Sequence, residues 1–190
     1  MTKVYFVRHA KPDFSVHEDL IRPLTEEGLR DSKKVTEFLL DKDISKIYAS
    51  PYKRSMDTVR DLADKLKLDI ITKDDLRERA VSDGWIEDFK SFFRAQWEDF
   101  SYKLPKGECL KEVQERNVQA LKEILKENCG DNVVVGTHGT ALSTIINYYD
   151  NKFGLDEFNR IIDIMPWVVV MEFQGEELIR VQEVDLLKDL

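Results

Sequence analysis

The sequence feature that most constrains the fold is a short run that is apolar on both faces. Residues 132–137 contain Val133, Val134 and Val135 in succession, with no polar residue between them. A strand with no polar face has to be covered on both sides, as happens at the centre of a sheet that lies between two layers of helices. The run therefore predicts a layered α/β domain.

The rest of the chain alternates short apolar runs with amphipathic segments, as such a domain requires. Strands are expected near residues 3–8, 45–49, 68–72, 132–137, 167–173 and 177–184. The last two are expected to form a hairpin that turns at residues 174–176. The predicted fold is a three-layer α/β/α sandwich with a mostly parallel central sheet and helices on both faces. A chain of 190 residues is expected to form a single domain, residues 1–190.

Four helices can be placed from their start signals and apolar periodicity. One is expected to begin near Thr25, whose hydroxyl precedes two glutamates in the first turn, and another near Ser50-Pro51, with Ser50 as the capping residue. Two more are expected over residues 108–128 and 140–149.

Residues 84–104 depart from this alternation and are expected to form a helical insertion. Their distinguishing feature is a high aromatic content: Trp85, Phe89, Phe92, Phe93, Trp97, Phe100 and Tyr102. These side chains could simply pack on the core. Alternatively, they could form a cap over an active site that excludes water and holds an apolar part of a substrate. The sequence leaves both interpretations open.

Composition and charge restrict the partners. The content of 42% hydrophobic and 35% charged residues is typical of a soluble globular protein, and the net charge of −8 disfavours binding to a nucleic-acid backbone. The start of the chain has no basic leader followed by an apolar segment, so we expect a cytoplasmic protein that does not bind membranes. A small anionic substrate remains compatible with the charge, because a few arginines in a cleft can create a local positive potential.

The two cysteines do not suggest a metal site or a disulfide. Cys109 and Cys129 are too far apart for a Cys-x-x-Cys pair and have no histidine nearby. We expect both to be reduced thiols and expect no bound metal.

The residues that could carry chemistry fall at strand and helix ends. Arg8 and His9 follow the first apolar run, and His138 follows the run at 132–137. In open α/β sheets, ligands bind at the carboxyl ends of strands. Arg54 falls in the first turn of the helix after Ser50-Pro51, where backbone N–H groups already favour an anion. Each feature alone is common, but together they predict an anion site; His17, in a probable loop, is expected to be merely exposed.

In combination, motifs spread over residues 3–184 resemble the histidine phosphatase superfamily, which includes the cofactor-dependent phosphoglycerate mutases and many small phosphatases. The matching segments, in chain order, are Val7-Arg8-His9-Ala10, Leu24-Thr25-Glu26-Glu27-Gly28, Ser50-Pro51-Tyr52-Lys53-Arg54-Ser55-Met56-Asp57-Thr58, Leu76-Arg77-Glu78-Arg79, Lys106-Gly107-Glu108 and Val135-Gly136-Thr137-His138-Gly139. The resemblance implies a phosphoglycerate mutase-like fold.

The resemblance also implies a role for each matching residue. His9 would be the nucleophile, Arg8, Arg54 and His138 would hold the phosphoryl oxygens, and Glu78 would be the proton donor. These roles agree with the chemistry, because neutral imidazole can attack phosphorus and cationic groups stabilise an in-line transition state without a cofactor. Asp83 is an alternative proton donor if the loop is arranged differently.

Several positions depart from the family pattern. Ala10 replaces the glycine of the signature, which is tolerable if its backbone N–H faces the phosphate and its φ is negative. Ser15 stands where an asparagine is frequent and could contact phosphate, and Cys109 stands in place of a serine. Lys11 and Arg79 could bind a second anionic group on the substrate or could be solvated surface charges.

The expected function is hydrolysis of a phosphomonoester through a phosphohistidine intermediate, with a small phosphorylated metabolite as substrate. Three alternatives remain: a cofactor-dependent phosphoglycerate mutase, a non-catalytic phosphate-binding protein on the same fold, and metal-dependent hydrolysis. A homodimer is also compatible with the sequence.

Overall fold

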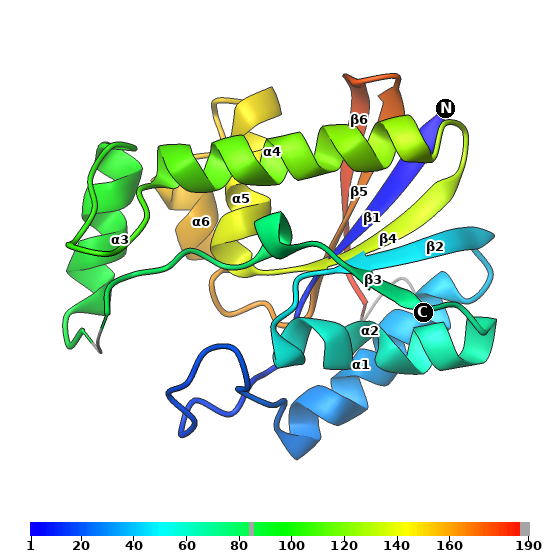
Figure 1. Cartoon of the computed structure of the whole chain (residues 1–190), viewed down its shortest axis with the longest axis horizontal. Coiled ribbons are helices and arrows are strands. Elements are labelled where there is room, and N and C mark those ends of the chain that lie inside the picture. Colours follow the sequence, from blue (N-terminus) through cyan, green and yellow to red (C-terminus); the bar gives the residue numbers. More distant parts are fainter. Residues whose placement is uncertain (84–85, 187–190) are drawn as a thin grey trace.

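A computed structural model describes residues 1–83 and 86–186 and contains a six-stranded sheet between two layers of helices (Figure 1). The strands are β1 (Thr2–Arg8), β2 (Ile44–Ala49), β3 (Ile70–Thr72), β4 (Asn132–Thr137), β5 (Trp167–Gln174) and β6 (Glu177–Val184), in the spatial order β3-β2-β4-β1-β5-β6. Strands β1 to β4 are parallel, whereas β5 is antiparallel to both β1 and β6. The predicted three-layer sandwich and its closing hairpin are confirmed.

The helices divide between the two faces of the sheet (Figure 1). One face is covered by α1 (Glu26–Leu39) and α2 (Lys53–Leu66), and the other by α4 (Leu110–Glu127) and α5 (Gly139–Tyr149). Two shorter helices lie on that second side: α6 (Leu155–Ile161) packs beside α5, and α3 (Phe89–Glu98) packs against α6. The short 3₁₀ helix η1 (Asp74–Leu76) follows β3. The sequence analysis did not anticipate α6, whose seven residues are too few to show a clear helical period.

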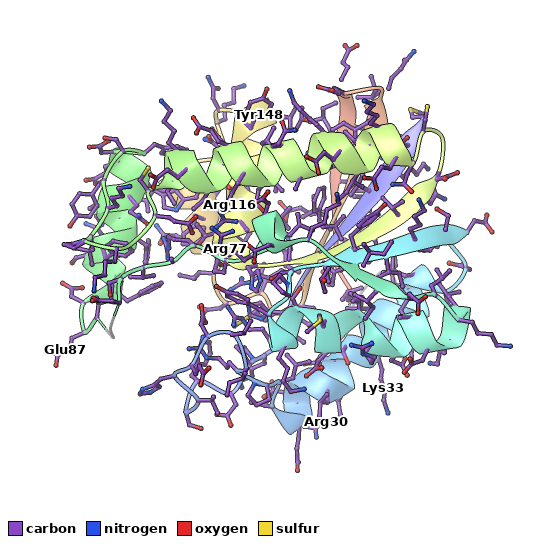
Figure 2. The ribbon with its side chains drawn as sticks, in the orientation of Figure 1. Arg30, Lys33, Arg77, Glu87, Arg116 and Tyr148 are labelled. Carbon is purple, nitrogen blue, oxygen red and sulfur yellow. The ribbon has the colours of Figure 1, made fainter. Side chains whose placement is uncertain are left out.

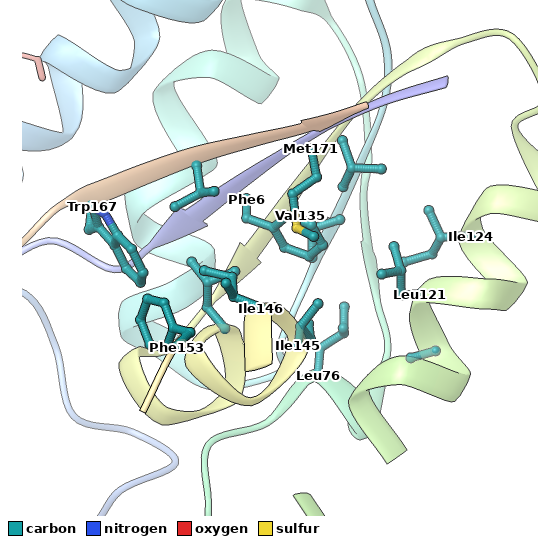
Figure 3. Close-up of a cluster of buried hydrophobic side chains, with 14 of the residues drawn as sticks. Phe6, Leu76, Leu121, Ile124, Val135, Ile145, Ile146, Phe153, Trp167 and Met171 are labelled. Carbon is teal, nitrogen blue, oxygen red and sulfur yellow. The ribbon is translucent and has the colours of Figure 1, made fainter. Parts of the chain in front are cut away.

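The two central strands contribute side chains to separate apolar clusters on the two faces. On β1, Phe6 points to the α4 and α5 side, where it packs with Val135, Met171, Leu121 and Ile145 (Figure 3). Tyr5 and Val7 on β1, together with Val134 on β4, belong to the cluster under α1 and α2. This two-sided burial is what the apolar run at 132–137 predicts.

The start of α2 differs from the prediction. The helix begins at Lys53, and Tyr52 occupies the N-cap position without a capping side chain. Ser50 lies further upstream. Its hydroxyl lies 2.8 Å from Nε2 of His138 and accepts the N–H of Tyr52 at 3.3 Å, so it bonds to no N–H inside the helix. Arg54 still falls in the first helical turn.

The insertion contains α3, whose aromatic side chains pack on the rest of the protein. Phe93 and Trp97 are buried, and both rings contact Phe158 of α6, with centroids 5.5 and 5.4 Å apart. The segment therefore packs on the core of the protein. Two of its rings, those of Phe89 and Phe92, also contact Arg79. Gly84 and Trp85, which the predicted insertion includes, lie outside the described residues.

The start of α1 is anchored on the chain that follows β1. Thr25 caps the helix as predicted, because its hydroxyl accepts the Gly28 N–H at 3.0 Å. The Thr25 N–H and hydroxyl both donate to the Lys11 carbonyl, at 3.0 and 3.1 Å. A Cβ on Gly28 would lie 2.3 Å from that same carbonyl oxygen, closer than real atoms approach. Glycine at this position lets α1 contact the backbone directly after His9.

We predict that Gly28→Ala destabilises the protein by about 1–3 kcal/mol, because the added methyl group forces α1 away from Lys11. In a helix without such a contact the same substitution would stabilise, since alanine is the better helix former. Thermal unfolding checks the sign. Gly154→Ala is the comparison variant, because the nearest atom to its added Cβ is 3.9 Å away, and it should cost no more than about 1 kcal/mol, the usual cost of alanine in place of glycine at an N-cap. An increase in stability for Gly28→Ala would contradict the analysis.

Candidate active site

The two site histidines come together because β1 and β4 pair in parallel. Arg8 at the end of β1 lies opposite Thr137 at the end of β4, and the His9 N–H donates to the Thr137 carbonyl at 3.1 Å. The next residue on each strand is a histidine, so both rings lie at the carboxyl edge of the sheet. Their centroids are 5.3 Å apart.

His9 is held in a form suited to nucleophilic attack. Its Nδ1 lies 2.8 Å from the Ala10 carbonyl oxygen, which can only accept a hydrogen bond. Nδ1 must therefore carry a proton, and in the neutral ring the lone pair is on Nε2. Burial lowers the pKa of His9 well below its usual value, and the charges of Arg54 and Arg8 lower it further. The ring is neutral near pH 7.

His138 is also neutral and fully buried. Its Nε2 lies 2.8 Å from the Ser50 hydroxyl, and its ring contacts Tyr52 with a centroid separation of 5.2 Å. Burial lowers the pKa of His138 well below the usual value, and the charge of Arg54 contributes to the shift. Among the described residues Nδ1 has no hydrogen-bond partner. When Ser50 donates to Nε2, Nδ1 carries the proton and can donate to a bound anion.

The turn after His9 is fixed by α2. Thr58 accepts the Ala10 N–H at 3.0 Å and donates its own hydroxyl to the Arg54 carbonyl at 2.7 Å. This contact explains why a threonine follows the arginine by four positions. The Ala10 N–H is therefore already bonded within the protein.

Arg54 lies in the first turn of α2, as predicted, and its side chain is buried. Its guanidinium stacks on the Tyr52 ring at 5.0 Å and donates to the backbone carbonyl of Asp19 at 2.7 Å. The Asp19 carboxylate lies 3.1 Å from the same nitrogen. Burial lowers the pKa of Arg54, while the charges of Asp19 and Glu78 oppose that shift.

Arg8 is also buried, but most of its donors are already used. Its two terminal nitrogens donate to the carbonyls of Ile161, Ile162 and Ile164, at distances of 2.8 to 3.1 Å. Only Nε lacks a partner among the described residues. Burial lowers the pKa of Arg8 to about 10, against the opposing charge of Glu78. Three of the five N–H groups of the Arg8 guanidinium are thus used, and Nε–H together with one N–H of Nη2 remains for a phosphoryl oxygen.

Glu78 lies at the N-terminus of α5, beside His138. Its carboxylate accepts the N–H groups of Thr140 at 3.0 Å and Ala141 at 3.2 Å, and also that of Arg79 at 2.8 Å. Asp83, the alternative proton donor, instead forms an exposed ion pair with Lys106 at 2.7 Å. The geometry thus favours Glu78 over Asp83.

Arg79 is not a surface charge. It is 3% exposed, and its guanidinium lies over the rings of Phe89 and Phe92 at 5.3 and 5.2 Å. One terminal nitrogen donates to the Gln96 side chain at 2.6 Å, whereas Nε has no partner among the described residues. Burial lowers the pKa of Arg79, and Glu78 is the nearest opposing charge. Aromatic rings of the insertion therefore pack against the Arg79 guanidinium.

The remaining candidates lie outside the cluster of buried groups. Lys11 is exposed and forms an ion pair with Glu27 at 2.6 Å. The Ser15 hydroxyl donates to the Asp13 carboxylate at 2.7 Å on an exposed loop. Cys109 is buried at the N-cap position of α4 and is a free thiol, as is Cys129.

Asp19 and Arg22 were missed by the sequence analysis. Arg22 donates to the Asp19 carboxylate at 2.6 Å, and its charge helps to lower the pKa values of both His9 and Arg54. Both residues lie on the loop after β1, which has no periodic pattern and no motif that would place them beside the histidines. Only the long-range contact with α2 reveals them.

Within residues 1–83 and 86–186, no three metal-ligating side chains come together, and no helix is long and apolar enough to span a bilayer. The expectations of a metal-free, cytoplasmic protein remain predictions.

Buried neutral histidines beside several arginines at the carboxyl edge of an α/β sheet are groups suited to phosphoryl transfer. The chain matches the histidine phosphatase superfamily (branch 1) over residues 4–183. It therefore belongs to that superfamily, as the sequence motifs indicated, and is a phosphatase or phosphomutase.

Relatives of known name fall into the same two activities. The chain is 28% identical over 153 residues to phosphoserine phosphatase 1 of Hydrogenobacter thermophilus, covering 73% of this chain and 71% of the relative. It is 27% identical over 161 residues to the probable phosphoglycerate mutase GpmB of Yersinia pestis, covering 77% and 74%.

Solved structures confirm the phosphoglycerate mutase-like fold. YhfR of Bacillus stearothermophilus superposes with a TM-score of 0.81 at 23% identity, covering 99% of this chain and 100% of the other. A phosphoserine phosphatase mutant of Entamoeba histolytica, in complex with phosphoserine, gives 0.79 at 16% identity, with 100% of both chains covered.

The buried histidines predict a loss of stability in acid. Below about pH 6.5 the unfolded chain binds protons on His9 and His138 that the folded protein does not bind, because both folded pKa values are lowered. Lowering the pH from 7 to 5.5 should therefore reduce the free energy of unfolding by about 1 kcal/mol for each histidine. Urea titrations without phosphate measure this slope.

The double variant His9→Asn, His138→Asn should lose that part of the pH dependence. His17→Asn, at the exposed third histidine, is the matched control and should keep it. An unchanged slope in the double variant would contradict the assignment of two neutral, buried rings.

Proposed function

We propose that this protein hydrolyses a small phosphorylated metabolite through a phosphohistidine formed on His9. The observation that carries the proposal is the state of the His9 ring, which is neutral and buried, with Nδ1 bonded to the Ala10 carbonyl. That bond leaves the lone pair on Nε2, beside the charges of Arg8 and Arg54.

The reaction takes place in two displacements at phosphorus. His9 Nε2 attacks, the P–O bond to the alcohol breaks, and Glu78 in its acid form gives a proton to the departing oxygen. Water then attacks the phosphohistidine, the P–N bond breaks, and the Glu78 carboxylate accepts a proton from the water. Arg54, the Arg8 Nε and His138 stabilise the phosphoryl oxygens in both transition states.

The proposed substrate carries a second anionic group. Arg79 supports this because it is buried next to Glu78, and its Nε has no partner among the described residues. A carboxylate near the phosphate ester would satisfy that donor. Lys11, the other cation considered for this role, is already paired with Glu27 on the surface. The phosphoserine phosphatases among the relatives are named for a substrate of this kind.

We predict that the wild-type protein becomes labelled on His9 when mixed rapidly with a labelled phosphomonoester and quenched in base, where phosphohistidine survives. His9→Ala should abolish both labelling and turnover while leaving thermal unfolding nearly unchanged. Substrates should include phosphoserine, 3-phosphoglycerate and neutral phosphate esters, to test the preference for a second anion.

Each alternative gives a different result in that experiment. Transfer of the label to an added sugar acid in preference to water would identify a mutase, and binding of phosphate without any labelling would identify a binding protein. Activity that chelators remove would indicate a metal-dependent reaction. Turnover that persists in His9→Ala would exclude the proposed nucleophile.

We predict that Glu78→Gln slows poor leaving groups more than good ones, because only a poor leaving group needs a proton as its bond breaks. The value of kcat/KM should fall by about 100-fold for an alkyl phosphate and by under about threefold for 4-nitrophenyl phosphate. Asp83→Asn is the matched control and should leave both values unchanged. Equal slowing of both substrates by Glu78→Gln would remove Glu78 from the acid role.

A further inference from the structure

We propose that Arg116 is a positioning residue that fixes the proton donor, Glu78, in the site. Arg116 lies on α4 and contacts the loop that carries Glu78. This inference rests on the proposed function, since it assumes that Glu78 transfers the proton.

The loop around Glu78 depends on side chains for its backbone hydrogen bonds. Residues 77–82 follow η1 and form neither helix nor strand. Arg116 Nη1 donates to the carbonyls of Asp75 and Arg77, each at 2.8 Å, and Nη2 donates to the carbonyl of Glu78 at 3.2 Å. The Arg116 guanidinium thus donates to loop carbonyls that would be paired by a neighbouring strand in a sheet.

Glu108 holds Arg116 in place and also contacts the loop on both sides of Glu78. Its two carboxylate oxygens accept from Arg116 Nε at 2.8 Å and Nη2 at 2.9 Å. They also accept from the Arg77 side chain at 3.1 Å and from the Ala80 N–H at 2.9 Å. Figure 2 shows Arg77 and Arg116 together between α4 and the loop.

This network is largely shielded from solvent. The side chains of Arg116 and Glu108 are 11% and 17% exposed. Burial alone would raise the pKa of Glu108, but the bonds from Arg116 and from the Ala80 N–H outweigh it, and the net pKa is lowered. The Glu108 carboxylate is therefore charged near pH 7, and a bidentate pair of this kind has a defined geometry.

Arg116 acts through Glu78 and not on the substrate. All three of its side-chain nitrogens are bonded to Glu108 or to loop carbonyls, so none is left for a phosphate. The Glu78 carboxylate is fixed from the opposite side by the N–H groups of Thr140 and Ala141. The loop is thus held by α4 on one side and by the start of α5 on the other. Weakening its hydrogen bonds to Arg116 on α4 therefore moves the Glu78 carboxylate relative to His9.

The test uses the dependence of rate on the leaving group, because a general loss of structure would slow all substrates alike. In Arg116→Lys, kcat/KM should fall about tenfold or more for an alkyl phosphate and by under about threefold for 4-nitrophenyl phosphate. Arg116→Ala should give a larger loss with the same selectivity. Glu108→Gln, which keeps the side-chain shape, is a second variant in case Arg116→Ala does not fold.

A double-mutant cycle separates positioning from scaffolding. In a Glu78→Gln background, Arg116→Lys should change the alkyl phosphate rate by under about twofold, because the group it positions is already gone. Arg160→Ala is the matched control, since Arg160 also pairs with two glutamates but does so on the exposed surface, and it should have no effect.

The inference and the proposed function fail in distinguishable ways. Absence of label on His9 in the wild-type protein would overturn the proposed function. Label on His9 together with equal slowing of both substrates by Arg116→Lys and Glu108→Gln, or with the same fold-loss in both backgrounds, would overturn the positioning role alone.

Discussion

The parallel pairing of β1 with β4 is the contact on which the site depends. Neither strand contributes a catalytic side chain from its interior; each is buried on both faces and serves to end at a fixed place. Because the register sets Arg8 opposite Thr137, His9 and His138 lie side by side just after the ends of the two strands. The helices then add one group each: α2 brings Arg54, and the start of α5 holds the Glu78 carboxylate. A slip in the register of these two strands would separate the two rings.

The site concentrates positive charge in a protein whose net charge is −8. Burying a guanidinium without partners is unfavourable in free energy, and each buried arginine has a different set of partners. Arg8 uses backbone carbonyls near the end of α6, Arg54 uses Asp19, and Arg79 uses Gln96 and two phenylalanine rings. In Arg8 and Arg79 the partial satisfaction leaves Nε as the donor without a partner among the described residues. Each buried cation is thus partly satisfied by groups of the protein itself.

Strand ends and motif spacing could be predicted from sequence because they depend on local pattern and on the geometry of parallel sheets. The positions of His9, Arg54 and His138 follow from this logic. The burial of Arg79 could not be predicted, because it depends on rings of an insertion whose packing has no sequence signal. The hydrogen bonds from two Arg8 nitrogens to carbonyls near the end of α6 could not be predicted either, because α6 is too short to show a helical period. Arg116 is similar, since on sequence alone it reads as one more charged residue of an amphipathic helix.

The contact between Arg54 and Asp19 affects how the site treats any incoming anion. The loop after β1 places both a carbonyl and a carboxylate on the guanidinium, so Arg54 already has a ligand that is tethered to the chain. A tethered ligand has a high effective concentration, so a free anion competes with Asp19 for this Arg54 nitrogen. Under the proposed function, an ester that also contacts Arg79 would have a second attachment that orthophosphate lacks.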